Sequence, residues 1–556
     1  MSLPSAFRLA LHASALGALA AAAPAQLIGT WPVPAFPTGN PTSQSGIDPN
    51  AALREDLGKL LFWDEQLSHD RSVACATCHA IEFGGNDKHG GAPHPGFDGI
   101  PGTADDSFGS PGVVRQDPNG DYAADPFFGV GQQATGLNAP TMIGAAFFEK
   151  LFWDKRAGPT FSDLNGNQVN GFGSNAALED QASGPPANSV EMGHDGIAWA
   201  AIEQKLPRLV PLALASNIPP TFPVVAGQTY QQLFDAAFGV GPVTREKASI
   251  VLASYMRTLI PDQAPVDLGT MTPSQVAGLN LFRSRGCQLC HSNGGTIQFN
   301  AATQTFGDPN DLLFSDGLGH NIQLVGHNVF PPNFTNHDFG GPKTPTLRNV
   351  GLRKRLFHSG HVTSLAQAMA LQYNNPATPV TFRFQPLLNA TEQAQVLDFL
   401  QNALTDPRVA NAQPPFDHPT LRGDVVPFGQ NQVGPGSPGT GGVTPTMISN
   451  APPKLGNAAW KFGLGDALPG ALVQLWLAPQ LNPGQVIGGI PFELDRMTAQ
   501  LVGTFTVGAN GTVTVKRAIG TNPALLGVEL DWQWLVVDPA AVGGKAASPA
   551  ATFTIF

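Results

Sequence analysis

The strongest constraint on this chain comes from two five-residue motifs, Cys75-Ala76-Thr77-Cys78-His79 and Cys287-Gln288-Leu289-Cys290-His291. Each reads C-x-x-C-H, the attachment signature of c-type haem, in which two thiols bond to the porphyrin and the adjacent imidazole ligates iron. The alternatives for one such motif are a redox C-x-x-C pair, a structural disulfide and half of a zinc site. Two copies about 200 residues apart use all four cysteines, which matches neither a compact zinc module nor a disulfide framework. The motifs therefore predict two covalently bound haem c groups.

Length and composition narrow the class of protein further. At 556 residues the chain is too long for one core and should hold about three domains. Its 63 glycines and 51 prolines, with 42% hydrophobic and 13% charged residues, indicate an ordered, loop-rich secreted protein. The net charge of -11 argues against a nucleic-acid partner, because phosphate binding needs clustered Lys and Arg.

The first 25 residues (1–25) are typical of a secretory signal peptide. Arg8 precedes an apolar run from Leu11 to Ala23, and Ala23-Pro24-Ala25 offers a small-residue cleavage site. The run is too short for a membrane span, and no later stretch is long enough for one. Covalent haem attachment in bacteria takes place outside the cytoplasm. We therefore predict a periplasmic protein without a membrane span.

A helix leads into each haem motif. Asp48-Pro49 reads as an N-cap and N1 pair for a helix ending near Phe62, and Thr272-Pro273-Ser274-Gln275 reads as a capping box ahead of the second motif. Further helices are predicted over 244–259 and 389–400. This weak duplication predicts a mainly α protein with two cytochrome c-like haem domains, at 26–262 and 263–415.

The rest of the chain has a different character. An irregular insertion spans 84–136, and its segment 98–106 reads either as a calcium loop or, as we favour, as a solvated Asp/Gly turn. Residues 416–450 are predicted to form an extended or loosely ordered linker. Apolar alternation in 451–556, with Asn510-Gly511 as a hairpin turn, predicts a C-terminal all-β, sandwich-like accessory domain. Docking, assembly or a surface role is expected of this domain rather than chemistry.

Several longer motifs carry a resemblance to a known family. They are Leu57-Gly58-Lys59-Leu60-Leu61-Phe62, Asn138-Ala139-Pro140-Thr141, Phe152-Trp153-Asp154-Lys155-Arg156-Ala157, Gln181-Ala182, Gly184-Pro185, Glu191-Met192, Thr344-Pro345-Thr346-Leu347-Arg348-Asn349 and Phe357-His358-Ser359-Gly360. In this order the chain resembles the bacterial di-haem cytochrome c peroxidases and their MauG-type relatives, over roughly residues 48 to 410. The signal peptide and the C-terminal domain lie outside the resemblance.

The resemblance implies a peroxidatic haem in the N-terminal domain, on Cys75, Cys78 and His79. Glu191 would be its distal acid/base and Gln181 would lie in the same pocket. Cleavage of an O–O bond needs a group that takes a proton from one oxygen and gives it to the other, which a partly buried carboxyl can do. Without the resemblance, Glu191 reads as a solvated loop carboxylate.

The second haem, on Cys287, Cys290 and His291, is implied to be the electron-entry centre. Trp153 would stand between the haems as an electron relay, although a plain core aromatic is the alternative. The resemblance also implies a calcium ion with Asn138 as a ligand. Backbone carbonyls near Arg353 and Arg355 would complete that site, and two arginines there depart from the family pattern.

The sequence does not determine which residue is the sixth ligand of each iron. In the family it is a methionine at the second haem of peroxidases and a tyrosine in MauG-type enzymes. Counting without gaps along the helix that follows the motif at Phe357 puts Gln372 at that position. Met369 and Tyr373 lie four residues apart on one helix face. We favour Tyr373, with Met369 as the alternative. At the first haem, His89 or His94 would be a displaceable ligand or a surface residue, and His358 reads as structural.

These observations predict a periplasmic di-haem c-type peroxidase, an oxidoreductase that reduces hydrogen peroxide to water. Its electrons would come from a small redox protein, a cytochrome c or a cupredoxin, and the acidic surface suits a basic donor. The first alternative is a MauG-type oxidase acting on a protein or organic substrate. The second is a non-catalytic electron-transfer cytochrome. A homodimer is compatible with the sequence.

Overall fold

The computed structural model describes residues 50–224, 227–320, 341–374, 388–425, 432–448, 452–458 and 460–556, with the backbone alone at 372–374. The predicted signal peptide and the Asp48-Pro49 helix start lie outside the described residues. Among the described residues, no helix is both long enough and apolar enough to cross a bilayer.

The core of the N-terminal domain forms where two helices cross. α1 (Ala51–Phe62) packs on α6 (Arg245–Thr258), and a Cβ at Gly58 would lie 1.8 Å from the Val251 carbonyl oxygen, so only glycine permits this approach. The helix predicted over 244–259 is confirmed, and its Thr244 side chain accepts a hydrogen bond from the Lys247 N–H. The remaining helices of this domain are α2 (Cys75–Cys78), α3 (Ala177–Ala182), α4 (Trp199–Lys205) and α5 (Tyr230–Phe238).

The domain around the second C-x-x-C-H motif repeats this arrangement. α8 (Pro273–Ser284) opens with the predicted capping box, since Thr272 Oγ1 accepts from Gln275 N and Gln275 Oε1 accepts from Thr272 N. α8 packs on α10 (Ala390–Asp398), and a Cβ at Gly278 would lie 2.1 Å from a backbone oxygen of α10. The matching glycine contacts support the predicted duplication. The other elements here are α7 (Pro265–Leu268), α9 (Leu365–Asn374), a π-helical turn (Phe399–Ala403), α11 (Pro407–Ala410), β5 (Phe299–Asn300) and β6 (Thr305–Phe306).

The insertion between the first haem motif and Asn138 contains two antiparallel strand pairs. They are β1 (Ala92–His94) with β2 (Ser107–Gly109) and β3 (Pro111–Val114) with β4 (Gln132–Ala134). Between β1 and β2, the Asp105 carboxylate accepts hydrogen bonds from the backbone N–H groups of Phe97 and Asp98 and from the Thr103 hydroxyl. The carboxylate thus stabilises its own turn. This geometry favours the solvated turn over the calcium loop.

Two antiparallel sheets packed face to face form the body of the C-terminal domain, as the sequence predicts, and β11 and β12 form a separate two-stranded sheet. The five-stranded sheet has the order β13-β10-β15-β16-β7 and the three-stranded sheet the order β14-β9-β8. Trp532 and Trp534 line the interface, where the Trp532 ring lies 4.6 Å from that of Phe462 and Trp534 Nε1 donates to the Gly463 carbonyl. The strands are β7 (Gln432–Val433), β8 (Thr446–Ile448), β9 (Lys461–Gly465), β10 (Leu472–Ala478), β11 (Val486–Ile487), β12 (Ile490–Pro491), β13 (Gln500–Thr506), β14 (Val513–Lys516), β15 (Glu529–Val537) and β16 (Lys545–Thr554).

The predicted hairpin at Asn510-Gly511 is wrong. β13 pairs with β10 and β14 pairs with β9, so the turn carries the chain from one sheet to the other. An Asn-Gly turn reverses the chain in both cases, and the apolar faces of the flanking strands decide whether they pair or separate.

The predicted linker over 416–450 is also wrong for its described residues. β7 pairs with β16 and β8 pairs with β9, so this segment already supplies two strands of the C-terminal domain. Upstream of them, α12 (Arg422–Val425) follows the buried Phe416, and Asp417 forms an ion pair with Lys59 at 2.7 Å. The polar composition of this segment suggested a solvated chain. In the structure, Phe416 packs into the core of the N-terminal domain, and β7 and β8 pair with strands of the C-terminal domain.

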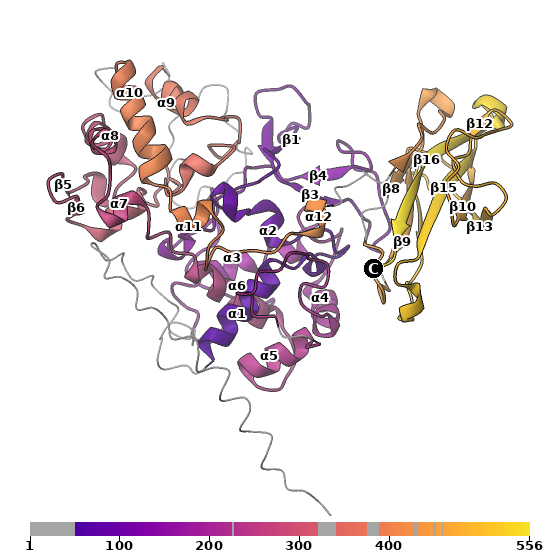
Figure 1. The fold of residues 1–556 in the computed structure, drawn as a ribbon, viewed down its shortest axis with the longest axis horizontal. Helices are drawn as coiled ribbons and strands as arrows, with labels where there is room; N and C mark the ends of the chain where they lie inside the picture. The colour runs from indigo at the N-terminus through magenta and orange to yellow at the C-terminus, as the bar shows by residue number, and fades with distance from the viewer. Residues whose placement is uncertain are drawn as a thin grey trace, which may run out of the picture.

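Figure 1 shows the C-terminal domain at one end of the molecule, beside β3 and β4 of the insertion, with the helices of the second haem domain at the other end.

Candidate active site

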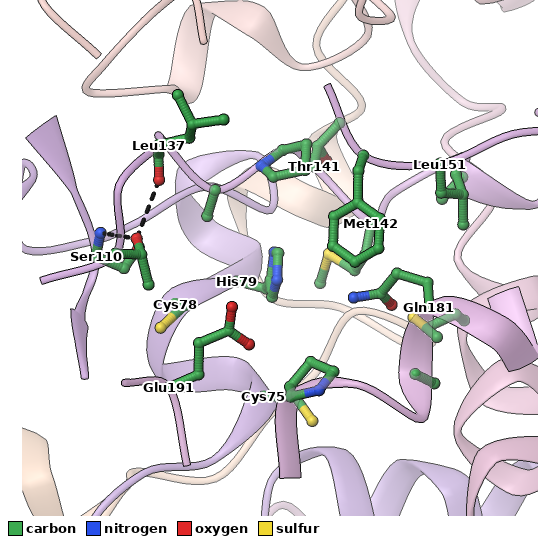
Figure 2. A pocket seen from close by; sticks show the side chains of 18 of the residues that line it. Cys75, Cys78, His79, Ser110, Leu137, Thr141, Met142, Leu151, Gln181 and Glu191 are labelled. Atoms are coloured by element: carbon green, nitrogen blue, oxygen red, sulfur yellow. Dashed lines mark hydrogen bonds between the residues drawn. The ribbon is translucent and has the colours of Figure 1, made fainter. Parts of the chain in front are cut away.

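The first haem motif lies at a cavity of about 360 Å³ in the N-terminal domain. The short helix α2 presents Cys75 and Cys78 to it, and His79 follows at the end of that helix. Gln181 from α3 and Glu191 from a loop line the same cavity, and Figure 2 shows their polar ends directed toward the space around His79. The structure therefore brings together all five residues that sequence reasoning assigned to the first site.

The second haem motif lies at a separate cavity of about 260 Å³. Cys287, Cys290 and His291 line it together with Met369 of α9. Of the two candidates for the sixth ligand, Met369 is thus placed in the cavity wall, whereas the side chain of Tyr373 lies outside the described residues. The choice of Tyr373 remains a prediction.

The donor groups in both cavities suit a c-type haem. The Nδ1 atom of His79 lies 3.4 Å from the Gly85 carbonyl oxygen, and that of His291 lies 2.9 Å from the Phe314 carbonyl oxygen. A ring that donates from Nδ1 keeps the Nε2 lone pair for a metal. Burial lowers the pKa of both imidazoles, which favours the neutral form that can ligate a metal. All four cysteines are free thiols, so each pair is available for thioether bonds.

Glu191 is held by its local turn. The Asn188 side-chain oxygen accepts hydrogen bonds from the N–H groups of Val190 and Glu191, at 2.9 Å and 3.0 Å. Burial raises the pKa of the Glu191 carboxyl above its ordinary value, and the nearby Arg156 opposes that shift. The carboxyl is therefore not the freely solvated group that the loop sequence alone suggests.

Trp153 lines both cavities. Its side chain is 8% exposed, its Nε1 donates to the Asn138 carbonyl at 2.8 Å, and its ring packs edge-on against His358. Trp153 is therefore a buried core aromatic that also lines both cavities. Its role as an electron relay remains a prediction. His358 is buried in the wall of the second cavity.

Asn138 joins the two domains at this point. Its side-chain nitrogen donates to the carbonyl of Phe357 at 3.0 Å and to that of Arg355 at 3.4 Å, and its oxygen accepts from Asn86 at 3.0 Å. The Arg355 carbonyl thus accepts a hydrogen bond from Asn138, while Arg353 donates to the Arg348 carbonyl. Within the described ranges there is no cluster of three or more His, Cys, Asp or Glu residues suited to a metal ion. The calcium site remains a prediction.

Neither His89 nor His94 lines the first cavity. His89 lies beside Asp87 with a side chain that is 43% exposed, and His94 lies on β1, where its Nδ1 accepts from the Gly96 N–H. The geometry thus favours the surface interpretation for both residues.

The sequence analysis did not identify several residues of the cavity walls, among them Ser110 and Lys343. Ser110, from the insertion, lines the first cavity, and Lys343 lines both. The Lys343 ammonium lies 3.9 Å from the centre of the Phe148 ring, and burial lowers its pKa to about 8. Its position directly before the motif that begins at Thr344 was the available signal. Nothing in the irregular insertion marked Ser110.

Residues 52–271 match the family model described as di-haem cytochrome c peroxidase. The cytochrome c peroxidase Ccp of Escherichia coli K12 is 27% identical over 58% of this chain and 53% of its own length. The cytochrome c551 peroxidase of Nitrosomonas europaea is 24% identical over 67% of this chain and 85% of its own, and the methylamine utilization protein MauG of Methylophilus methylotrophus is 23% identical over 57% and 71%.

The chain thus aligns with about half the length of the E. coli protein. Relatives named cytochrome c peroxidase are oxidoreductases, the enzyme class that the sequence predicts, and the matched family model is described as di-haem. Among solved structures, a MauG-like protein associated with microbial copper homeostasis is 18% identical over 70% of this chain and 96% of its own, with a TM-score of 0.43. The diheme peroxidase BthA from Burkholderia thailandensis E264 is 19% identical over 72% and 99%, with a TM-score of 0.42.

Proposed function

We propose that this protein is a periplasmic di-haem c-type peroxidase that reduces hydrogen peroxide to water with electrons from a small redox protein. The observation that carries the proposal is the first cavity, which joins a complete C-x-x-C-H motif to a partly buried carboxyl and an amide. A plain electron-transfer cytochrome has no need for a proton-transfer group beside its haem.

The residues present suit covalent haem at both sites. Cys75 and Cys78 would form the thioether bonds of the first haem and His79 would ligate its iron, with Cys287, Cys290 and His291 in the same roles at the second. A haem bound in the first cavity would supply an open iron position for peroxide and a route for electrons.

Glu191 would perform the proton chemistry. The overall reaction takes hydrogen peroxide, two electrons and two protons to two waters, and one proton must move between the peroxide oxygens as their bond breaks. The Glu191 carboxylate accepts that proton from one oxygen and returns it to the other, while the Gln181 amide orients the peroxide by hydrogen bonding.

Electrons would pass from the second cavity to the first by way of Trp153, the aromatic residue that lines both. The relatives named cytochrome c peroxidase and cytochrome c551 peroxidase support a c-type cytochrome as donor, and the net charge of -11 suits a basic partner.

The Glu191→Gln variant tests the proposal. It keeps the size of the side chain but removes the ionisable oxygen, so kcat/KM for peroxide should fall by about 100-fold or more while both haems stay attached. Glu149→Gln provides the matched control, because Glu149 is exposed and lies outside the first cavity. Undiminished peroxide turnover in Glu191→Gln would refute the assignment, and absence of turnover in the parent protein would favour the electron-transfer cytochrome.

A MauG-type oxidase of a protein or organic substrate is the second candidate. Relatives named MauG support it, as does Tyr373, whose backbone lies one helical turn beyond Met369 on α9. Absorption and EPR spectra of Met369→Ala and Tyr373→Phe would distinguish the two functions. Loss of a thioether signature in Met369→Ala would support the peroxidase, whereas a spectral change confined to Tyr373→Phe would support the MauG-type enzyme.

A further inference from the structure

The C-terminal domain makes a buried polar contact with the insertion. Lys461 of β9 is 4% exposed, and its ammonium donates to the side-chain oxygen of Gln116 at 2.6 Å and to the carbonyl of Gly120 at 2.5 Å. It also lies 4.3 Å from the centre of the Tyr122 ring. Burial lowers the pKa of Lys461 to about 8. A buried ammonium of this kind needs the oxygens that surround it.

Further contacts fix the same stretch of the insertion. The Tyr122 N–H donates to Thr514 Oγ1 at 2.8 Å, and Thr512 Oγ1 donates to the Tyr122 carbonyl at 2.9 Å. A Cβ at Gly463 would lie 2.5 Å from an atom of the Tyr122 ring, so this glycine lets the ring lie flat on the sheet. The apolar side of this interface is formed by Val114, Tyr122, Val130 and Ile448. The contact therefore has the hydrogen bonding and packing of a domain interior.

The opposite side of the insertion holds the loop of Glu191. The Val113 N–H donates to the Val190 carbonyl at 2.9 Å, directly before Glu191. The Gln116 carbonyl accepts from the Asp195 N–H at 3.0 Å, a few residues after it. Gln116 thus binds Lys461 through its side chain and the Glu191 loop through its backbone.

We propose that the C-terminal β-domain positions Glu191 in the first cavity, with Lys461 as the positioning residue that acts through Gln116 and β3. This inference rests on the proposed function of Glu191 as the distal acid/base. A positioned proton-transfer group must stay within hydrogen-bond reach of the peroxide, and misplacement by about 1 Å can cost up to about 100-fold in rate. The β-domain, which lies outside the family resemblance, thereby becomes part of the support of the reaction site.

The test begins with Lys461→Met in the full, haem-loaded protein. Methionine keeps the apolar stem and removes the ammonium, so kcat/KM for peroxide should fall by about tenfold. Hydrogen exchange should accelerate at the amides of 113–116 and 189–195, a readout independent of turnover. Lys516→Met is the matched control. Lys516 also joins the β-domain to the insertion, where its ammonium donates to the Asn119 carbonyl and pairs with Asp121, but its side chain is 54% exposed, so little change is expected.

A double-mutant cycle separates positioning from general damage. In a Glu191→Gln background, Lys461→Met should lower kcat/KM no further, because the group that it positions is already absent. Equal losses in both backgrounds would overturn the proposal, and so would an unchanged kcat/KM in Lys461→Met despite faster exchange at 189–195. Glu191→Gln alone reports on the proposed function, so the two failures are distinguishable.

If Lys461→Met does not fold, a milder variant at the same interface tests the proposal. Thr514→Val removes only the acceptor for the Tyr122 N–H, at the same interface. It should reproduce both the faster exchange and the loss of kcat/KM at smaller amplitude, again only when Glu191 is present. Wild-type kinetics in Thr514→Val with faster exchange in the Glu191 loop would contradict the positioning role.

Discussion

The ion pair between Arg257 and Glu179 holds one wall of the first cavity and allows a quantitative test. Arg257 of α6 donates two parallel hydrogen bonds to the Glu179 carboxylate of α3, at 2.7 Å and 2.8 Å, and the side chains are 3% and 0% exposed. α3 also carries Gln181, so the pair fixes the helix that presents this amide to the cavity. We expect Arg257→Met to destabilise the N-terminal domain strongly, because it removes the Arg257 counter-charge and its two hydrogen bonds from a buried carboxylate.

The magnitude follows from burial. Removing one partner of a fully buried, hydrogen-bonded ion pair costs about 3–5 kcal/mol. For a domain of this size, each kcal/mol lowers Tm by about 2–4 °C, so Arg257→Met should lower Tm by roughly 6–20 °C. Urea unfolding of the haem-loaded protein, followed by tryptophan fluorescence, measures the free-energy change directly.

Two further variants make this prediction refutable. Glu179→Gln combined with Arg257→Met should recover most of the loss, since uncharged side chains often replace a buried ion pair at little cost. Lys516→Met breaks the exposed pair with Asp121 at 2.9 Å and should change stability by less than about 1 kcal/mol. If Arg257→Met is no less stable than Lys516→Met, or if the double variant is as unstable as Arg257→Met, the reasoning fails.

Other predictions concern packing, pH and electron transfer. Gly58→Ala should destabilise the protein in urea unfolding by about 1–3 kcal/mol, because its methyl group would meet the Val251 carbonyl, whereas an alanine in an open helix stabilises. As burial raises the pKa of Glu191 and only the ionised form accepts a proton, kcat/KM should fall as pH is lowered through that pKa, and Glu191→Gln should abolish this fall. Trp153→Phe, which loses the bond to the Asn138 carbonyl, should slow electron transfer between the haems in stopped-flow experiments without loss of either haem; an unchanged rate would exclude the relay.

Several features of this protein could be read from short stretches of sequence. The capping box at Thr272, the helix that follows it and the helix over 244–259 were predicted within a residue or two. Their signals are local, because a cap or a C-x-x-C-H motif involves groups no more than about four residues apart. The pairing of Glu191 and Gln181 with the first motif had no such local signal. Resemblance to the family supplied it, and the structure places them in one cavity.

The connections between distant segments were decided by the tertiary structure. The Asn510-Gly511 turn joins two sheets instead of two neighbouring strands, and the segment predicted as a linker contributes β7 and β8. The insertion, which had no periodicity to interpret, connects Lys461 to the loop of Glu191. The two C-x-x-C-H motifs were enough by themselves to predict haem c as the cofactor. The tertiary structure decided which surfaces support the reaction site. These contacts depend on the burial of apolar faces and on the pairing of buried polar groups hundreds of residues apart, which no local sequence pattern predicts.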